Sequence, residues 1–183
     1  SYGLLTLLSD EQVHVPREEK YARLVRKISD NVGIQEASSV SINYDPTYQK
    51  LIIHDIKVIR QGKSVNKLNI NNFQTIRQES NAESYIYDGS LNAIANLSDI
   101  RKGDIIDMSY TIKGFNPIHN GHLATSSSLN DYEPVGKINF NIISDTKLFY
   151  KILNSDQEPE ISSNNGYTSY NWQVINTDKP LLE

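Results

Sequence analysis

The feature that most constrains the fold is an alternation of apolar and polar side chains that recurs along the chain. It is clearest in Asp104–Lys113, where every second residue is large and apolar and the residues between are mostly polar. The same alternation occurs in Lys137–Ile143 and in Thr168–Val174. Neighbouring side chains of a strand point to opposite faces, so each segment predicts a strand with one buried face. The residues that we expect in the core include Tyr110, Phe140 and Trp172.

Further strands are predicted from apolar segments and from the turn residues that join them. Leu51–Arg60 is apolar on both faces in its first half, which predicts a more central strand. Gln61-Gly62 then leads into a hairpin with Lys63–Leu68. The dipeptide Asn165-Gly166 is typical of a two-residue hairpin turn, so we expect Glu160–Ser162 to pair with Tyr167–Val174.

Three shorter features complete the predicted elements. Leu148–Ile152 and the triplet Ser126–Ser128 are interpreted as short strands. The segment Arg101–Asp104 is interpreted as a turn in which Gly103 adopts a positive φ. The stretch 155–165 is the most loop-like part of the chain.

The N-terminal third leaves two alternatives open. Glu18–Ile28 has apolar residues at helical spacing but also tolerates a strand with one irregularity. Gly33–Ser39 holds at most one helical turn. Together the segments predict one all-β domain over residues 1–183, a two-sheet antiparallel sandwich, immunoglobulin-like or related, with little helix.

Composition excludes several classes of function. The chain of 183 residues has no cysteine, which rules out disulfides, thiolate metal sites and a cysteine nucleophile. Its 18 basic and 22 acidic residues are well mixed, which argues against a nucleic-acid partner. No apolar run is long enough to span a membrane, and this sequence contains no signal peptide.

Two histidines close together, His119 and His122, are the nearest approach to a metal signature. Pro117 and Gly121 place them in a loop, and further ligands would have to come from Asp131 or Glu133. We expect a polar loop and no metal site.

Other combinations of polar residues are also expected to be structural. His54 and Asp55 are strand neighbours on opposite faces, so they cannot form an acid–base couple, and we expect a partly buried His54. His14 lies between two valines and is interpreted in the same way. Asp88-Gly89-Ser90 lacks the surroundings of a serine nucleophile and predicts a tight turn before a strand. We therefore expect no catalytic, cofactor-binding or metal-binding residue.

Aromatic residues offer the one alternative role, which is ligand binding. Four tyrosines near predicted turns could form a stacking platform for a glycan or peptide: Tyr85, Tyr87, Tyr167 and Tyr170. The identity of any ligand is unknown from the sequence. The sequon Asn96-Leu97-Ser98 is a short match of the kind that occurs by chance.

Three groups of segments resemble one known family. They are Tyr44–Lys50 with Gln61–Lys63; Tyr87–Leu91 with Asp99–Ile106; and Gly114–Pro117 with Gly121-His122. Over nearly the whole chain the sequence resembles domain of unknown function 3857. This β-rich domain is found N-terminal to transglutaminase-like domains in exported bacterial proteins, especially those of Bacteroidetes type.

The resemblance implies a two-sheet sandwich, a strand at Tyr21–Ile28, and a periplasmic or cell-surface location. It also implies a transglutaminase-like domain in the same polypeptide. No functional residue is carried over, because no function is established for the family domain. We therefore expect a non-enzymatic accessory module that positions or covers that catalytic domain. The alternative is a module that binds a glycan or a cell-wall peptide through the surface tyrosines.

Overall fold

The computed structural model describes residues 3–77, 89–131 and 134–175. Within this part of the chain the fold is mostly β, with two sheets and one α-helix, α1 (Asn31–Ala37). The strands are β1 (Leu4–His14), β2 (Glu19–Ile28), β3 (Ser39–Tyr44), β4 (Lys50–Arg60), β5 (Lys63–Asn66), β6 (Gln74–Arg77), β7 (Leu91–Asn96), β8 (Ile105–Lys113), β9 (Lys137–Ser144), β10 (Glu160–Asn164) and β11 (Tyr167–Ile175). The prediction of an all-β fold with two sheets and little helix is confirmed.

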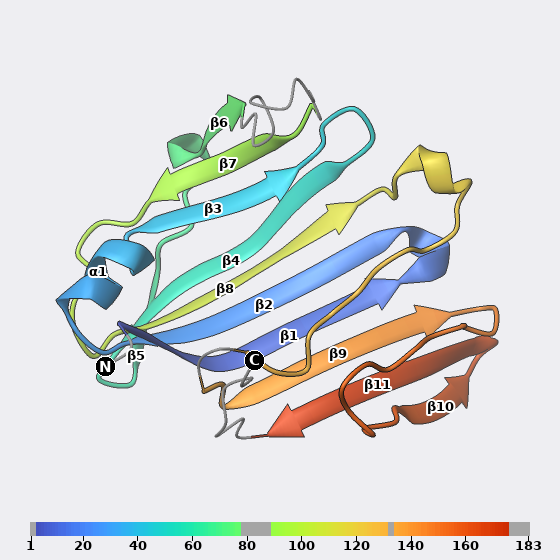
Figure 1. The fold of residues 1–183 in the computed structure, drawn as a ribbon. Coiled ribbons are helices and arrows are strands. Elements are labelled where there is room, and N and C mark those ends of the chain that lie inside the picture. Colours follow the sequence, from blue (N-terminus) through green and yellow to red (C-terminus); the bar gives the residue numbers. More distant parts are fainter. Residues whose placement is uncertain (1–2, 78–88, 132–133, 176–183) are drawn as a thin grey trace.

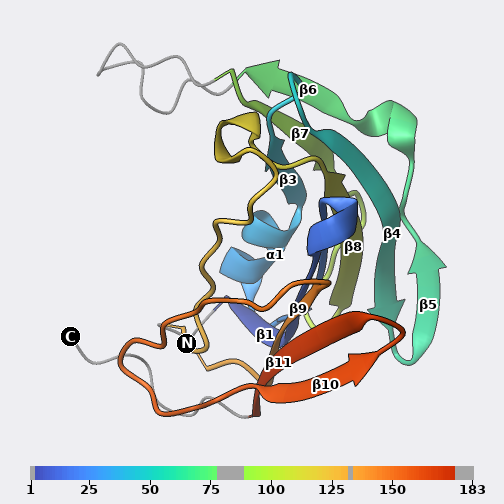
Figure 2. The same cartoon turned by 90° about the vertical axis from the view of Figure 1, so that its right-hand side faces the viewer.

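The two sheets differ greatly in size. The larger has eight strands in the order β10-β11-β9-β1-β2-β8-β4-β5, and the smaller has three in the order β3-β7-β6. α1 and the small sheet lie against one face of the large sheet, which we call its inner face (Figure 2). The opposite face is called the outer face. No described helix is long and apolar enough to cross a membrane.

One strand pair departs from the antiparallel expectation. β1 and β9 run parallel, with Ser9 opposite Ile138 and Val13 opposite Ile142. Parallel neighbours require a long crossover between them. β9 is reached by a connection that follows β8, of which residues 114–131 pass in front of β2 and β1 (Figure 1).

The apolar residues on the inner face form two separate clusters. The first is enclosed by β2, β4 and β8 on one side and by α1 and β3 on the other, with Ile28, Ile56 and Val58 almost inaccessible. The second lies over β9 and β11 and contains Phe140 and Trp172. The prediction that these two aromatic residues are buried is confirmed. Tyr110 is only half-buried, because it lies at the margin of the first cluster.

The ambiguous N-terminal third is resolved by pairing. Glu19–Ile28 is a strand, because it has β1 on one side and β8 on the other, and this tertiary context overrides its helical spacing. The short helix α1 begins after Asp30, whose side chain accepts a hydrogen bond from the Gly33 amide at 3.0 Å. The helix expected near Gly33–Ser39 is therefore present, although it starts earlier and has 7 residues, about two turns.

Turn predictions are confirmed where glycine sets the geometry. Gln61 and Gly62 have φ of 50° and 76°, and Asn165 and Gly166 have φ of 51° and 81°. Two consecutive positive φ values define the turn that suits a twisted hairpin. Gly103 also has the expected positive φ, at 88°.

Two predicted strands are wrong. Neither Leu148–Ile152 nor Ser126–Ser128 belongs to a sheet. β9 and β11 pair directly with each other, so no strand position is open beside them. Both segments instead pass over the inner face of this pair, where their side chains line a groove.

Candidate functional site

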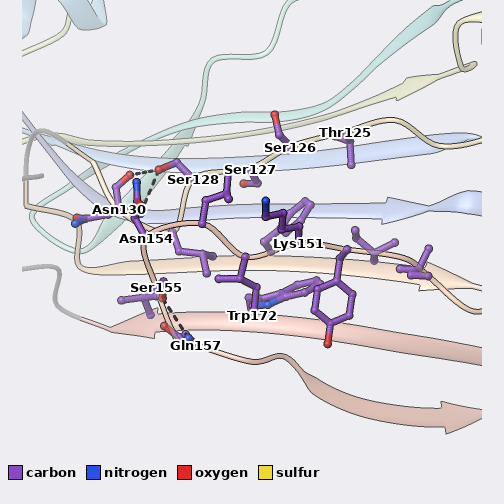
Figure 3. A pocket seen from close by; sticks show the side chains of 18 of the residues that line it. Thr125, Ser126, Ser127, Ser128, Asn130, Lys151, Asn154, Ser155, Gln157 and Trp172 are labelled. Carbon is purple, nitrogen blue, oxygen red and sulfur yellow. Dashed lines mark hydrogen bonds between the residues drawn. The ribbon is translucent and has the colours of Figure 1, made fainter.

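A groove with a volume of about 1010 Å³ lies over the inner face of β9 and β11. Its floor is apolar and comes from alternate residues of the two strands: Phe140, Ile142, Trp172 and Val174. One side is formed by residues 123–130 and the other by residues 148–157 (Figure 3). The volume is at the upper end of the range of typical ligand sites, roughly 300–1,000 Å³.

Aromatic rings give the floor a fixed shape. The rings of Phe140 and Trp172 stack with centroids 5.7 Å apart, and Tyr150 meets Trp172 edge-on at 5.3 Å. Tyr150 also donates a hydrogen bond to Glu158 at 2.8 Å, which raises the pKa of the tyrosine. These contacts hold the segment 148–157 against β11 without a β ladder.

The upper margin of the groove is polar and nearly uncharged. Figure 3 shows Thr125–Ser128 along one side and Ser155 and Gln157 along the other, with Lys151 over the floor. Hydroxyls and carboxamides can both donate and accept hydrogen bonds. The groove can therefore bind a chain with apolar side chains and neutral polar groups.

Two large apolar side chains of the groove are unusually accessible. Phe149 is 94% exposed and Leu153 is 69% exposed. Both lie on the segment 148–157. Apolar surface beside a groove is typical of a protein–protein contact.

The sequence did not identify this groove. The signal was available, because Leu148–Leu153 is an apolar run within a region rich in Asn, Ser, Asp and Pro. We interpreted the run as a strand, and that interpretation assigned its side chains to a sheet surface. A segment that packs over a sheet can show the same apolar pattern as an edge strand. The pattern alone therefore could not distinguish the two structures.

The histidine loop contains a short turn. Pro117–His119 form a 3₁₀ turn, and the amide of His122 donates to the carbonyl of His119 at 2.9 Å. The described residues contain no group of three or more His, Asp or Glu side chains placed to hold a metal ion. Asp131 is described and exposed, whereas Glu133 lies outside the described residues.

His54 differs from the prediction. It is exposed and lies in a β-bulge, because the pairing of β4 with β8 shifts register between Ile53 and Asp55. Its Nε2 is 2.7 Å from Oγ1 of Thr111. The bulge reverses the alternation, so Ile53 faces the first cluster before it and Ile56 after it.

Four other predicted positions are structural or lie outside the described residues. His14 is partly buried, and its ring meets that of Tyr167 at 5.4 Å. Asp88 lies outside the described residues, but Gly89 has the positive φ of a turn residue and Ser90 is buried just before β7.

The tyrosine platform is not assembled by the described residues. Tyr85 and Tyr87 lie outside them. Tyr170 is buried at 7% exposure, and its hydroxyl accepts from the Leu148 amide at 3.4 Å. Of the two predicted platform tyrosines that are described, Tyr167 is the one open to solvent, at 40% exposure.

A charged cluster near Gly103 stabilises the turn before β8. Arg60 donates two hydrogen bonds of 2.8 Å to the carboxylate of Asp104, which is 1% exposed. Arg60 also bonds Asp99 at 3.1 Å, and the Arg101 amide donates to Asp104 at 2.9 Å. The guanidinium holds the pKa of Asp104 below its usual range. Both carboxylate oxygens of Asp104 accept hydrogen bonds from Arg60 or from the Arg101 amide, so we assign the cluster a structural role.

The fold and the groove define a class of protein, namely a β-rich module with an apolar groove and a neutral polar margin. The chain belongs to the family described as a domain of unknown function with a solved structure (DUF3857), whose model matches residues 16–180. This confirms the resemblance noted from the sequence.

Two solved structures are similar to this chain, and the first of them shares its fold. A candidate protease from Parabacteroides distasonis matches with a TM-score of 0.80 at 17% identity, over 99% of this chain and 36% of its own. Aminopeptidase A from Legionella pneumophila, solved in complex with aspartic acid, matches with a TM-score of 0.47 at 13% identity, over 98% of this chain and 20% of its own. This chain therefore spans about a third of the first protein's length. None of the curated proteins compared with the chain matches it.

Proposed function

We propose that this chain is a non-catalytic accessory module of a larger exported protein. In this proposal it docks against a transglutaminase-like domain of the same polypeptide through the groove over β9 and β11. The observation that carries the proposal is the exposed apolar surface at the groove, which consists of Phe149 and Leu153.

Two further observations support a role within a larger protein. In the Parabacteroides distasonis protein, the matching fold covers 36% of a longer chain. Val174, near the accessible end of β11, lines the groove next to Trp172. An apolar surface of this kind suits an inter-domain contact, which typically buries about 600–1,500 Å².

The absence of cysteine from the sequence supports a non-catalytic role. Transglutaminase-like chemistry requires a thiolate nucleophile, so that chemistry would have to come from another domain. We expect the purified chain to turn over no peptide, ester or glutamine-amide substrate. Turnover that disappears in Ser90→Ala, His119→Ala or His122→Ala would contradict this part of the proposal.

The docking itself is tested in the longer polypeptide. Phe149→Ser with Leu153→Ser should loosen the contact, which small-angle scattering would detect as a larger radius of gyration. The matched control is Ile70→Ser, because Ile70 is 69% exposed and does not line the groove. An unchanged radius for the double variant, or an equal increase for the control, would show that the groove is not the docking surface.

A further inference from the structure

The outer face of the large sheet is left open by the rest of the fold. α1 and β3 cover the first apolar cluster on the inner face, and the segments that carry Leu129 and Leu148 cover the second. Among the described residues, neither apolar cluster includes an outward side chain of β11, β9, β1 or β2. The side chains of this outer face therefore meet solvent or a ligand.

Strand pairing aligns the outward side chains into two adjacent rows. The first row consists of Asn171, Asn141, Gln12, Tyr21 and Thr111. The second row consists of Gln173, Asn139, Asp10, Arg23 and Ser109. Neighbouring strands are about 4.8 Å apart, so each row is a line of closely spaced polar groups.

The composition of these rows is unusual for strands. Five carboxamides occupy outward positions on the adjacent strands β11, β9 and β1, namely Asn171, Gln173, Asn139, Asn141 and Gln12. Asparagine is depleted in strands, where β-branched and aromatic residues are favoured. Strand propensity therefore does not account for this set, whereas hydrogen bonding to a ligand would.

The carboxamides are held in place by neighbours in the rows. Asn139 donates to Asp10 at 2.6 Å, and Gln12 donates to the other oxygen of the same carboxylate at 3.0 Å. Asn141 accepts from the Ser169 hydroxyl at 2.6 Å. Among the described residues, these bonds leave the side-chain oxygens of Asn139 and Gln12 and the amide nitrogen of Asn141 for another partner.

The charges near the rows are largely neutralised within the sheet. Arg23 forms two hydrogen bonds with Asp107, of 2.9 and 2.7 Å, and Lys57 pairs with Asp55. A surface that binds an anion presents hydrogen-bond donors to it, and a surface that binds a cation presents acceptor oxygens. A surface that offers both donors and acceptors fits hydroxyl groups, which also do both.

An aromatic side chain adjoins the carboxamides. Tyr21 follows Gln12 in the first row, and its ring lies 6.0 Å from that of His54. A tyrosine ring can pack against the C–H face of a sugar, while the carboxamides bind its hydroxyls.

We propose that the outer face of β11, β9, β1 and β2 binds an uncharged glycan chain. The site is distinct from the groove, which lies on the other face of the same strands, and it does not depend on the docking proposed above. The tyrosines first considered for glycan binding are not part of it.

The test is a titration of the ¹⁵N-labelled chain with three neutral hexasaccharides, cellohexaose, maltohexaose and mannohexaose, and with an alginate hexasaccharide as the charged comparison. At least one neutral glycan should shift the amide signals of β11, β9 and β1 and leave those of residues 123–130 unchanged. Asn139→Ala with Asn141→Ala should weaken binding by roughly thirtyfold, since two hydrogen bonds of about 1 kcal/mol each are lost.

The matched control is Asn43→Ala with Asn92→Ala. These exposed residues form a cross-strand carboxamide pair at 2.9 Å on the small sheet, and their loss should not change the affinity. If the first double variant does not fold, the exposed Gln173→Ala should still weaken binding severalfold. The proposal is wrong if no neutral hexasaccharide binds, if alginate binds equally well, or if neither set of row substitutions reduces the affinity.

Discussion

Individual residues secure this fold where strands meet turns, and Asp104 is the clearest case. Its carboxylate is buried at the start of β8 and is bound by the side chain of Arg60 from β4 and by the amide of Arg101. The Asp104 side chain therefore connects the end of β4 to the turn that precedes β8. Burial without these donors would be strongly unfavourable.

Asp104→Asn should lower the free energy of unfolding by about 2 kcal/mol at pH 7, because hydrogen bonds to a charged group contribute about 1.5–3 kcal/mol. The pKa of Asp104 is lowered in the folded state, so its stabilisation is present above the ordinary aspartate pKa of about 3.9 and is lost as the pH falls through the folded pKa. The difference between variant and wild type should therefore narrow below about pH 4.

Urea unfolding followed by Trp172 fluorescence at pH 7, 5 and 3 measures this difference. Asp156→Asn is the control, because Asp156 is exposed, and we expect a change below about 0.5 kcal/mol. A difference for Asp104→Asn that stays constant across the three pH values would contradict the account.

Glycine at position 114 is required by space as well as by φ. Its φ is 112°, and a Cβ there would overlap the carbonyl oxygen of Tyr48. Gly103 has φ of 88° but no atom within 4 Å of such a Cβ. Gly114→Ala should therefore destabilise by more than about 2 kcal/mol and Gly103→Ala by about 1 kcal/mol. Equal unfolding midpoints for the two variants in thermal melts would show that crowding at Tyr48 is relieved.

At the scale of elements, local signals predicted most strands and turns. Alternation identified β8, β9 and β11, and the Gln-Gly and Asn-Gly dipeptides identified the hairpins that they close. These signals depend on neighbouring residues alone, so a single sequence contains them.

Features that depend on distant parts of the chain were not predictable in this way. β2 became a strand because β1 and β8 flank it, and β1 pairs in parallel with β9 from the far end of the chain. The bulge at His54 reversed the alternation in β4, so the burial of His54 was predicted wrongly. The groove was missed for the same reason, since both of its sides are connections whose positions are set by tertiary packing.

The β10–β11 hairpin gives a prediction at this scale. Gly166→Val should speed amide hydrogen exchange in β10, because a β-branched residue disfavours the φ of 81° that the turn requires. The global stability should change by no more than about 1 kcal/mol, since all five residues of β10 are exposed.

Gly62→Val is the matched change in the β4–β5 turn, where φ is 76°. It should speed exchange in β5 and leave β10 unaffected. Faster exchange in both strands for either variant would mean that the two edges of the sheet are coupled.

The whole molecule is organised by a continuous sheet that carries two apolar clusters. Between them, β1 and β2 place the polar residues Glu11 and Lys20 on the inner face, and burial raises the pKa of Glu11. One cluster is covered by α1 and the small sheet and needs no partner. Among the described residues, two connections lie over the other cluster, and they leave the groove and the exposed Phe149. This asymmetry is the basis for expecting a second domain at the groove.

Amide hydrogen exchange tests that expectation most directly, when the chain alone is compared with the same chain inside its longer polypeptide. We predict slower exchange for residues 123–130 and 148–157 in the longer polypeptide, with unchanged exchange in α1 and β3. Equal exchange of the groove segments in both samples would contradict the central claim that the groove is where this module docks.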